Sequence, residues 1–515
     1  VTADDPSLHS SQNEQDNRHY ARLSYTPLFE PSSAQESYDM YKEAARLSQE
    51  TGRPVMLRMT THVCHAKERV TFAGWEAKPV DDSPRFAVGN GPYIPIASLV
   101  FPMKEKALAN REVVRQYANK SPLNRFIDNR NPMRGIITAG LPARSVLDVL
   151  EGVPGAPDIL VLGIVYPLAT NKVAAFLRGH SEVRILEELD DFLEQEIKSV
   201  AYDRSIRGRI VGKTTPDDWM GEYTPARVAA MLRKTWPDLA ISQPVEPVES
   251  CSPRPPQMCP GCGHRTAFHA VQLALGAEDI TVGDIGCHTL GFLEPYEVGQ
   301  VLLSMGHSMG TAAGMRLFNE SRKVLAFIGD STLFHAGLPG IVNAVFNRHN
   351  LTLIVMENGT TAMTGHQGHP ASGDNFNGET AAIPIEPLLR GLGVTSIRQT
   401  DAYAVKRLVP MIQEALAEDG VSVIIASHPC MLKQVREQRR AGTFKDKMVD
   451  VSEAKCSLAY ACVSDFACPT FQIDVEGKVT THPDLCIGDA SCIQTCPSRA
   501  ITAPRPRSQG EEVKS

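Results

Sequence analysis

Hydrophobic and polar positions along this chain follow a repeating pattern of short apolar runs separated by longer amphipathic stretches. The apolar runs have the length of buried strands, and the intervening stretches have helical periodicity. The clearest runs are Ile159–Gly163, Val183–Glu187, Ile280–Ile285, Lys323–Ile328, Leu351–Met356 and Val421–Ser427. Strands that alternate with helices predict an α/β fold built on parallel sheets.

Changes in this pattern divide the chain. Residues 1–75 end in a strand-like run, 53–60, after a helix-compatible stretch, 37–49, and read as the last α/β unit of a domain. Residues 76–134 show little periodicity beyond a charged helical pattern near 105–116, so we expect a connector. Residues 135–245 and 255–440 are each expected to form an α/β domain, separated by a linker with five prolines at 243–257. Residues 450–505 have short turns and many cysteines, which predicts a small metal-nucleated module.

Composition narrows the class of protein. The 515 residues are 42% hydrophobic and 22% charged, as in ordinary globular proteins. A net charge of −7 argues against a nucleic-acid-binding surface, and no apolar run approaches the ~18 residues of a membrane helix. The twelve cysteines, without any sign of an export signal, predict a cytoplasmic protein with reduced thiols or metal ligands rather than disulfides.

Two polar residues follow neighbouring strand-like runs. Asp330 comes directly after the run that ends in Gly329, and Asn358 lies 28 residues later, after the next run. Ligands bind at the carboxyl ends of strands in doubly wound sheets, and carboxylate and amide oxygens suit Mg²⁺. By itself this spacing also fits an ordinary Gly-Asp turn.

Four cysteines form a second candidate site. Cys259 and Cys262 follow the proline-rich linker, whereas Cys287 and Cys430 follow strand-like runs. These positions can converge at one corner of the domain. The residues alone leave zinc and an iron–sulfur cluster both open.

Six more cysteines lie within 41 residues near the carboxyl end, in two runs that each finish in Cys-Pro. A two-cluster ferredoxin has C-x2-C-x2-C-x3-C-P twice, and the last cysteine of each run binds the other cluster. On this template Ala459 and Asp489 replace one cysteine in each run. The template predicts a set A of Cys456, Cys462 and Cys496, and a set B of Cys468, Cys486, Cys492 and Asp489. A zinc-bound or empty remnant is the alternative.

Several longer runs resemble the catalytic subunit of 2-oxoacid:ferredoxin oxidoreductases of the indolepyruvate type. They are 9–18, 58–65, 183–197, 221–225, 283–291, 304–314 and 360–367, and the resemblance covers most of the chain. It implies two thiamine-diphosphate-binding domains, of the pyrimidine type (1–75) and the pyrophosphate type (255–440). Between them it implies a transketolase-C-terminal-like domain (135–245), with a small α+β two-cluster ferredoxin-like domain at the end.

The resemblance also assigns residues. It implies that Asp330, Asn358 and the Thr360 carbonyl hold Mg²⁺, and that Cys259, Cys262, Cys287 and Cys430 hold a proximal [4Fe–4S] cluster. The further residues expected in the cofactor pocket are Gly329, Ser331, Gly306, Ser308, His288 and His335. Gly306 and Ser308 are expected to offer backbone amides to the diphosphate at a helix start. His366 is a tentative catalytic residue. Ala459 and Asp489 leave [4Fe–4S] and [3Fe–4S] forms open for sets A and B.

The implied reaction converts an aryl 2-oxoacid such as indolepyruvate, with CoA and oxidised ferredoxin, to acyl-CoA, CO₂ and reduced ferredoxin. Pyruvate or branched-chain substrates, or a non-redox decarboxylase with vestigial clusters, are the alternatives. The implied partners are a smaller beta subunit and ferredoxin in an oligomeric enzyme. The glutamate that activates the cofactor in this family is expected upstream of Val1, in a missing segment of roughly one hundred residues.

Overall fold

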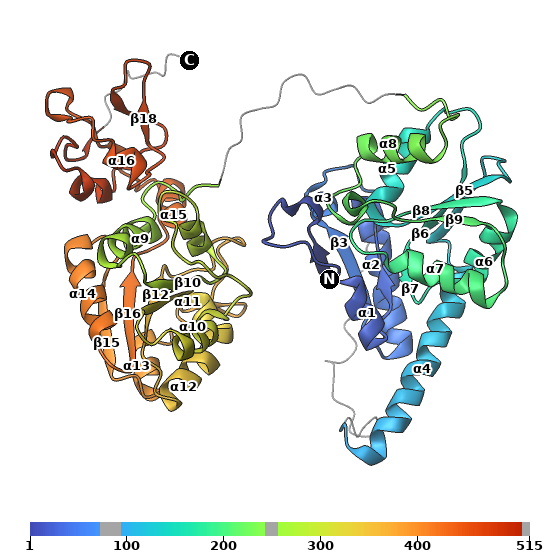
Figure 1. The fold of residues 1–515 in the computed structure, drawn as a ribbon, viewed down its shortest axis with the longest axis horizontal. Coiled ribbons are helices and arrows are strands. Elements are labelled where there is room, and N and C mark those ends of the chain that lie inside the picture. Colours follow the sequence, from blue (N-terminus) through green and yellow to red (C-terminus); the bar gives the residue numbers. More distant parts are fainter. Residues whose placement is uncertain (73–93, 243–255, 507–515) are drawn as a thin grey trace. The chain divides into compact units, whose positions relative to one another are not determined.

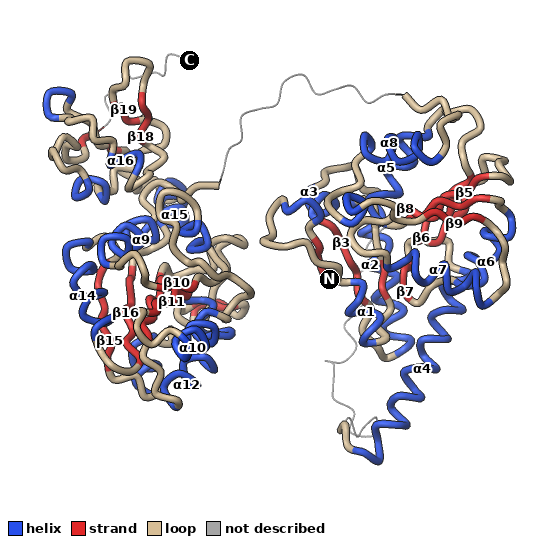
Figure 2. Tube along the Cα trace, in the orientation of Figure 1, coloured by secondary structure: helices blue, strands red, loops and turns tan. Residues whose placement is uncertain are grey.

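The computed structural model describes residues 1–72, 94–242 and 256–506, and these fall into two compact units, Val1–Ser250 and Cys251–Ser515. Both units contain sheets with helices packed on them (Figures 1 and 2). The predicted α/β class is confirmed. Most of the predicted linker at 243–257, part of the 76–134 connector and the tail from 507 lie outside the described residues. No described helix is long and apolar enough to cross a membrane.

The first unit has two sheets. The four-stranded sheet has the order β1 (Thr2–Asp4), β3 (Met56–Thr60), β2 (Leu28–Phe29) and β7 (Ile164–Tyr166), with helices α1 (Arg18–Ser24), α2 (Ala34–Thr51) and α3 (Thr61–His65). The five-stranded sheet has the order β4 (Asn124–Ile127), β6 (Asp158–Leu162), β5 (Arg134–Thr138), β8 (Glu182–Leu186) and β9 (Arg209–Val211). Its helices are α5 (Gly140–Leu150), α6 (Thr170–Gly179), α7 (Phe192–Asp203) and α8 (Pro225–Thr235).

The predicted connector contains more structure than its sequence indicated. Helix α4 spans Ala97–Lys120, twice the length of the expected helical pattern, and strand β4 follows it. The helix buries only Ala107, Val114 and Ala118. Three buried residues in seven turns leave a weak apolar periodicity, so the sequence pattern predicts a helix much shorter than the one that forms.

The second unit is built on a five-stranded parallel sheet of order β10 (Ile280–Val282), β11 (Val324–Gly329), β12 (Leu351–Glu357), β16 (Val421–Ser427) and β15 (Ser396–Asp401). Alternate strand residues enter two separate cores. Helices α9 (Gly263–Ala274) and α14 (Val405–Ala417) cover one face. Helices α10 (Ser308–Phe318), α12 (Leu338–Phe346) and α13 (Ile385–Gly391) cover the other. A sheet buried on both faces explains why its central strands read as continuous apolar runs.

After helix α15 (Met431–Arg440) the chain enters the cysteine-rich module. Strand β17 (Lys447–Met448) pairs with β20 (Arg505–Pro506), so the two ends of the module meet. Between them lie helix α16 (Ala461–Ser464) and the hairpin of β18 (Phe471–Ile473) and β19 (Val479–Thr481). Cys462, Cys468, Cys486 and Cys492 are part of its small buried core. Cysteine side chains therefore occupy positions where a larger domain would place aliphatic side chains.

Buried charges concentrate in the first unit. Arg58 is fully buried, and its Nη1 lies 2.6 Å from Glu30 Oε1 while its Nε donates to Asp4. Glu188 is also buried and accepts a hydrogen bond from the Tyr223 amide at 2.8 Å. Burial, followed by the negative charges of Glu30 and Glu222, raises the pKa of Glu188 to about 7. Glu188 is therefore a buried acid that ionises at a cost to folding.

Replacing Glu188 by glutamine is expected to change how stability depends on pH. A glutamate ionises near pH 4.5 in the unfolded chain but near pH 7 here, so the wild-type chain loses stability as the pH rises between these values. Glu188→Gln should remove this loss. The free energy of unfolding of the variant, relative to that of the wild type, should therefore be about 3 kcal/mol higher at pH 8 than at pH 4. Hydrogen exchange of the β5 and β8 amides at several pH values measures the stability. Glu151→Gln, an exposed substitution, is the control, and identical pH profiles for Glu188→Gln and wild type would contradict the expectation.

Candidate active site

Four parallel strands of the second unit end at the same edge of their sheet, and each is followed by a candidate residue. Asp284 follows β10, Asp330 follows β11, Asn358 follows β12 and Cys430 follows β16. Because β10, β11, β12 and β16 are consecutive neighbours, their carboxyl ends place these residues along one line. This is the edge at which open α/β sheets bind ligands.

Asp330 is buried, yet its carboxylate is the negatively charged form. Oδ2 accepts from the backbone amides of Asn358 (2.9 Å) and Gly359 (2.7 Å), and Oδ1 accepts from that of Ser331 (2.8 Å). Burial acts to raise the pKa, but the hydrogen bond and charge of His369, together with these amides, lower the pKa of Asp330 below its usual value. His369 Nε2 lies 3.4 Å from Oδ2. A carboxylate with about four lone-pair positions retains capacity for a further ligand.

The loop after β12 brings the other predicted Mg²⁺ residues to Asp330. The Asn358 side-chain oxygen accepts from the buried Thr360 amide at 3.0 Å, so the two residues share one turn. Thr361, next in the chain, lies with its hydroxyl 2.7 Å from the Ser331 hydroxyl, which also contacts His335 Nε2 at 2.9 Å. The candidate ligand atoms here are carboxylate, amide and carbonyl oxygens, which are the ligand types that Mg²⁺ takes in proteins.

The structure gives Gly306 and Ser308 a different role from the expected one. Their backbone amides donate to the buried carboxylate of Asp284, Gly306 at 2.9 Å and Ser308 at 3.2 Å. The start of α10 is therefore already satisfied by an internal anion. Gly306 has φ +85°, and a Cβ there would come 2.4 Å from that of Ala336. The Ser308 hydroxyl is buried with no partner among the described residues, so it, rather than the amide, remains available to a ligand.

The candidate histidines differ in their burial and in the residues that they contact. The buried His288 ring packs against the backbone of Gly286 and Gly329, and burial, followed by the charge of His264, lowers the pKa of His288 to about 3. His366 has φ +65° on a turn closed by its amide to the Thr361 carbonyl at 2.9 Å. The histidine that contacts Asp330 is His369 and not His366.

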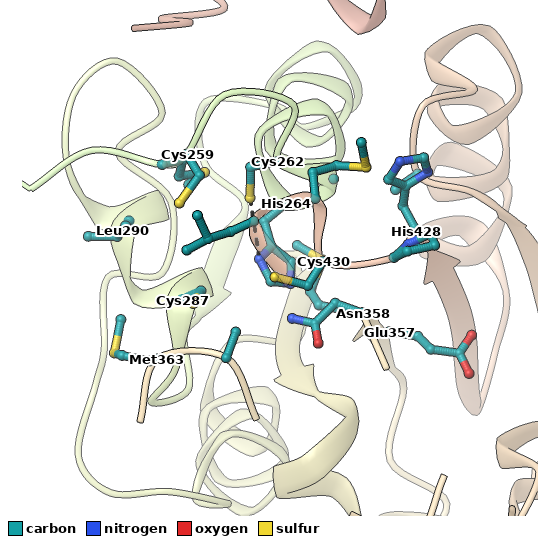
Figure 3. A pocket seen from close by; sticks show the side chains of 18 of the residues that line it. Cys259, Cys262, His264, Cys287, Leu290, Glu357, Asn358, Met363, His428 and Cys430 are labelled. Carbon is teal, nitrogen blue, oxygen red and sulfur yellow. Dashed lines mark hydrogen bonds between the residues drawn. The ribbon is translucent and has the colours of Figure 1, made fainter. Parts of the chain in front are cut away.

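Cys259, Cys262, Cys287 and Cys430 line one cavity of about 230 Å³, together with His264 and Asn358. Figure 3 shows the four side chains around this space, with Asn358 beside Cys430. The Cys430 amide donates to the Asn358 carbonyl at 3.0 Å, which joins the end of β16 to the Asp330 loop. The four cysteines and the Asp330 loop are thus parts of one candidate site.

The charges of these cysteines act on one another. Burial, followed by the negative charges of Cys262, Cys430 and Cys259, raises the pKa of Cys287 to about 12. For Cys262 burial acts in the same direction, but the charge and hydrogen bond of His264 outweigh it and lower the pKa to about 7. His264 Nδ1 lies 3.7 Å from Cys262 Sγ. His264 lines the cysteine cavity, and the charge of Asp330 also acts to raise the pKa of His264.

The six cysteines of the carboxyl-terminal module interact across the two runs. Burial, followed by the charges of Cys496 and Cys456, raises the pKa of Cys462 to about 11. Burial and the charges of Asp489, Cys468 and Cys486 raise the pKa of Cys492. The residues that act on one another are those of set A in the first case and those of set B in the second. This crossed arrangement is the one that the two-cluster template requires.

The spacing of the sulfur atoms bears on the kind of metal. Among the described residues, the only group of three ligand side chains whose atoms all lie within 4.8 Å of one another is Asp16, His19 and Asp190, and Asp16 there is already paired with Arg18 at 2.6 Å. Bonds of about 2.3 Å to a tetrahedral zinc ion would place ligand sulfurs only ~3.8 Å apart. No three of the described cysteines have sulfurs that all lie within 4.8 Å of one another.

Three residues of the site were not candidates from the sequence. Asp284, His264 and His369 each stand alone, outside any ligand-type spacing. For Asp284 the sequence did carry a signal, because it lies near the end of the strand-like run Ile280–Ile285. His264 sits two residues after Cys262 at the start of α9, whereas nothing in the sequence distinguishes His369 from the neighbouring His366.

Comparisons with known proteins agree on one kind of enzyme. Residues 284–426 match the family of the thiamine pyrophosphate enzyme C-terminal TPP-binding domain. The indolepyruvate oxidoreductase subunit IorA of Methanothermobacter marburgensis is 37% identical over 97% of this chain and 81% of that protein, and the subunit IorA of Archaeoglobus fulgidus is 34% identical over 97% and 80%. A 2-oxoacid:ferredoxin oxidoreductase subunit beta of Saccharolobus solfataricus is 28% identical over 33% of this chain and 61% of that protein.

Proposed function

The chain belongs to the family of the indolepyruvate oxidoreductase subunit IorA, and from this premise we propose the reaction that its site performs. One aryl 2-oxoacid, one CoA and two oxidised ferredoxins give one acyl-CoA, CO₂, a proton and two reduced ferredoxins. The observation that carries the proposal is the shared edge of the sheet, where the Asp330 loop and the four-cysteine cavity are joined through Asn358 and Cys430. Oxidation needs a one-electron acceptor next to the site of decarboxylation, and the proposed cofactor and cluster sites would be neighbours at this edge.

Thiamine diphosphate, when bound, supplies an electron sink for the carbon that loses CO₂. The chain's own residues would hold its metal: the Asp330 carboxylate, the Asn358 side-chain oxygen and the Thr360 carbonyl fit the oxygen preference of Mg²⁺. The amides of Asn358 and Gly359 fix the Asp330 carboxylate. The partnerless Ser308 hydroxyl and the ring of His288 are the remaining polar groups proposed for the cofactor pocket. His366, on the turn closed by the Thr361 carbonyl, is the proposed catalytic residue of this chain.

For the cysteines we propose iron–sulfur clusters rather than zinc. The proposed reaction needs a one-electron acceptor, which an iron–sulfur cluster supplies and a zinc ion does not. The proximal site has four thiols and would hold a [4Fe–4S] cluster. Set B has three thiols and the Asp489 carboxylate, and would hold a [4Fe–4S] cluster with one oxygen ligand or a [3Fe–4S] cluster. Set A has three thiols and no donor at Ala459, which favours a [3Fe–4S] cluster there.

Replacing Ala459 by cysteine is expected to convert set A to a four-iron form. The variant supplies the missing thiolate at the template position, so iron content should rise by one atom per chain. The [3Fe–4S] signal of the oxidised protein should weaken in anaerobic electron paramagnetic resonance. Ala461→Cys, two residues away in α16, is the matched control and should add no iron. An unchanged iron content and spectrum in Ala459→Cys would show that set A does not follow the ferredoxin template.

The remaining components of the enzyme are a smaller beta subunit, ferredoxin as electron acceptor and CoA as acyl acceptor, in an oligomer. The chain has a net charge of −7, so its overall charge would not attract an acidic ferredoxin. Binding of ferredoxin then depends on a local surface near the clusters.

The proposed function is tested with the anaerobically purified holoenzyme and its partner subunit. Reduction of ferredoxin should require both CoA and a 2-oxoacid, with indolepyruvate faster than pyruvate or 2-oxoisovalerate. Faster reduction with pyruvate or the branched-chain acid would change the substrate class and keep the reaction. Release of CO₂ without any reduction of ferredoxin would overturn the redox function and favour a non-redox decarboxylase.

A further inference from the structure

The loop that carries Cys259 and Cys262 packs directly on the part of the cysteine-rich module that carries set B. Gly261, at the tip of this loop, has φ +67°, and a Cβ at this position would lie 2.5 Å from Ile487 Cδ1 and 3.2 Å from Asp489 Oδ2. Both the left-handed backbone and the close approach require glycine here. The proximal loop therefore touches the segment of Asp489 without an intervening side chain.

Tyr403 reinforces this contact. Its hydroxyl donates to the Gly261 carbonyl at 2.6 Å, and its ring stacks on His428, with centroids 3.6 Å apart and an interplanar angle of 22°. On its other side, Gln494 donates from Nε2 to the Tyr403 carbonyl at 2.6 Å.

Arg265 makes a second bridge between the same two segments. It is buried, and its guanidinium donates to the Cys259 carbonyl at 3.0 Å and to the Phe466 carbonyl at 3.3 Å, with further bonds to the carbonyls of Met258 and Ala467. Ala467 directly precedes Cys468 of set B. One side chain thus holds the backbone beside the first proximal cysteine and the backbone beside a set B cysteine.

The first run of set A has no comparable connection, although Gln494 lies two residues from Cys496 of set A as well as from Cys492 of set B. Among the described residues, no hydrogen bond joins the run from Cys456 to Cys462 to the loop of Cys259 and Cys262. Cys456 lines a different cavity, of about 560 Å³, with Lys478, His482 and Arg505. The two cysteine sets therefore differ in their relation to the proximal site.

We propose that Tyr403 and Arg265 are positioning residues that fasten the proximal cysteine loop to set B, so that the set with Asp489, and not the set with Ala459, is the immediate neighbour of the proximal site. This inference rests on the proposed function, because it orders the two sets along the electron path that the reaction requires. Neither residue is a cluster ligand. Each acts through backbone carbonyls next to ligands.

Anaerobic electron paramagnetic resonance of the dithionite-reduced holoenzyme tests the order, because neighbouring paramagnetic clusters split each other's signals. Cys486→Ser, in set B, is expected to abolish the splitting of the proximal signal, whereas Cys456→Ser, in set A, should leave it. Loss of the splitting in Cys456→Ser would overturn the inference alone. Zinc and no iron in the wild-type protein would overturn the proposed function as well.

A pair of tyrosine variants tests the positioning role without touching any ligand. Tyr403→Phe removes the hydroxyl that donates to the Gly261 carbonyl, and Tyr460→Phe removes one that donates to the Gly477 carbonyl at 2.9 Å. With iron content unchanged in both, Tyr403→Phe should reduce the splitting of the proximal signal and Tyr460→Phe should not. A reduced splitting in Tyr460→Phe with none in Tyr403→Phe would overturn the positioning role.

Discussion

Replacing Asp330 by asparagine is expected to abolish Mg²⁺-dependent binding of thiamine diphosphate and leave the iron content unchanged. The substitution keeps the shape of the side chain but removes the negative charge, and one of its atoms becomes an amide nitrogen that faces the backbone amides of Ser331 or of Asn358 and Gly359. Changes in the outer shell of a metal site cost about 10–100-fold in affinity, so loss of a direct ligand should cost at least ~100-fold in the binding of Mg²⁺ and the cofactor.

Calorimetric titration of the cofactor in the presence of Mg²⁺ measures this loss, and activity should fall with it. Asp401→Asn is the matched control, because Asp401 also ends a strand, β15, of the same sheet, but its side chain is 59% exposed and it pairs with His428 instead. The control should bind the cofactor like the wild type. Normal cofactor binding by Asp330→Asn would mean that the metal site lies elsewhere.

Replacing Arg58 by methionine is expected to destabilise the first unit by about 3–5 kcal/mol, because it leaves the buried carboxylates of Asp4 and Glu30 without a cation. Arg125→Met breaks an ion pair of similar length, 2.6 Å to Glu36, but with an exposed arginine, so it should cost at most about 1 kcal/mol. Chemical denaturation followed by hydrogen exchange in β3 and β5 compares the two variants.

Adding Asp4→Asn and Glu30→Gln to the Arg58→Met variant should recover part of the lost stability. The recovery would show that the cost comes from unpaired buried charge and not from lost packing. A loss below 1 kcal/mol in Arg58→Met alone would instead mean that water reaches these carboxylates when the arginine is absent.

The sequence predicted the central strands and the residues at their ends because both depend on local patterns. Continuous apolar runs mark strands that are buried on both faces, and Asp330 and Asn358 follow such runs directly. Strand β15, at the edge of the same sheet, has partly exposed residues such as Arg398 and Gln399 and gave no such signal. An edge strand is stabilised by its one neighbour, here β16, which a local pattern does not contain.

The cysteine sets were predictable because their spacing follows a chemical template, whereas the residues that support them were not. His369 reaches Asp330 across 39 positions of sequence, and Arg265 reaches Ala467 across 202. Contacts of this kind depend on the tertiary fold alone. The amides of Gly306 and Ser308 illustrate the reverse case, because a local helix-start pattern suggested a ligand where the fold supplies the carboxylate of Asp284.

The bridge made by Arg265 has a consequence for how this region can vary among descendants of the chain. All of its acceptors are main-chain carbonyls, at positions 258, 259, 466 and 467, and every amino acid offers such a carbonyl. The hydrogen bonds of the bridge therefore need no particular side chain at these four positions, although Met258 and Phe466 are buried and the Arg265 guanidinium lies over the Phe466 ring. The arginine has no such freedom, because lysine offers one charged group where guanidinium offers five donors in a fixed plane. Over evolutionary time, substitutions in this contact should therefore occur at the positions that supply the carbonyls and not at Arg265.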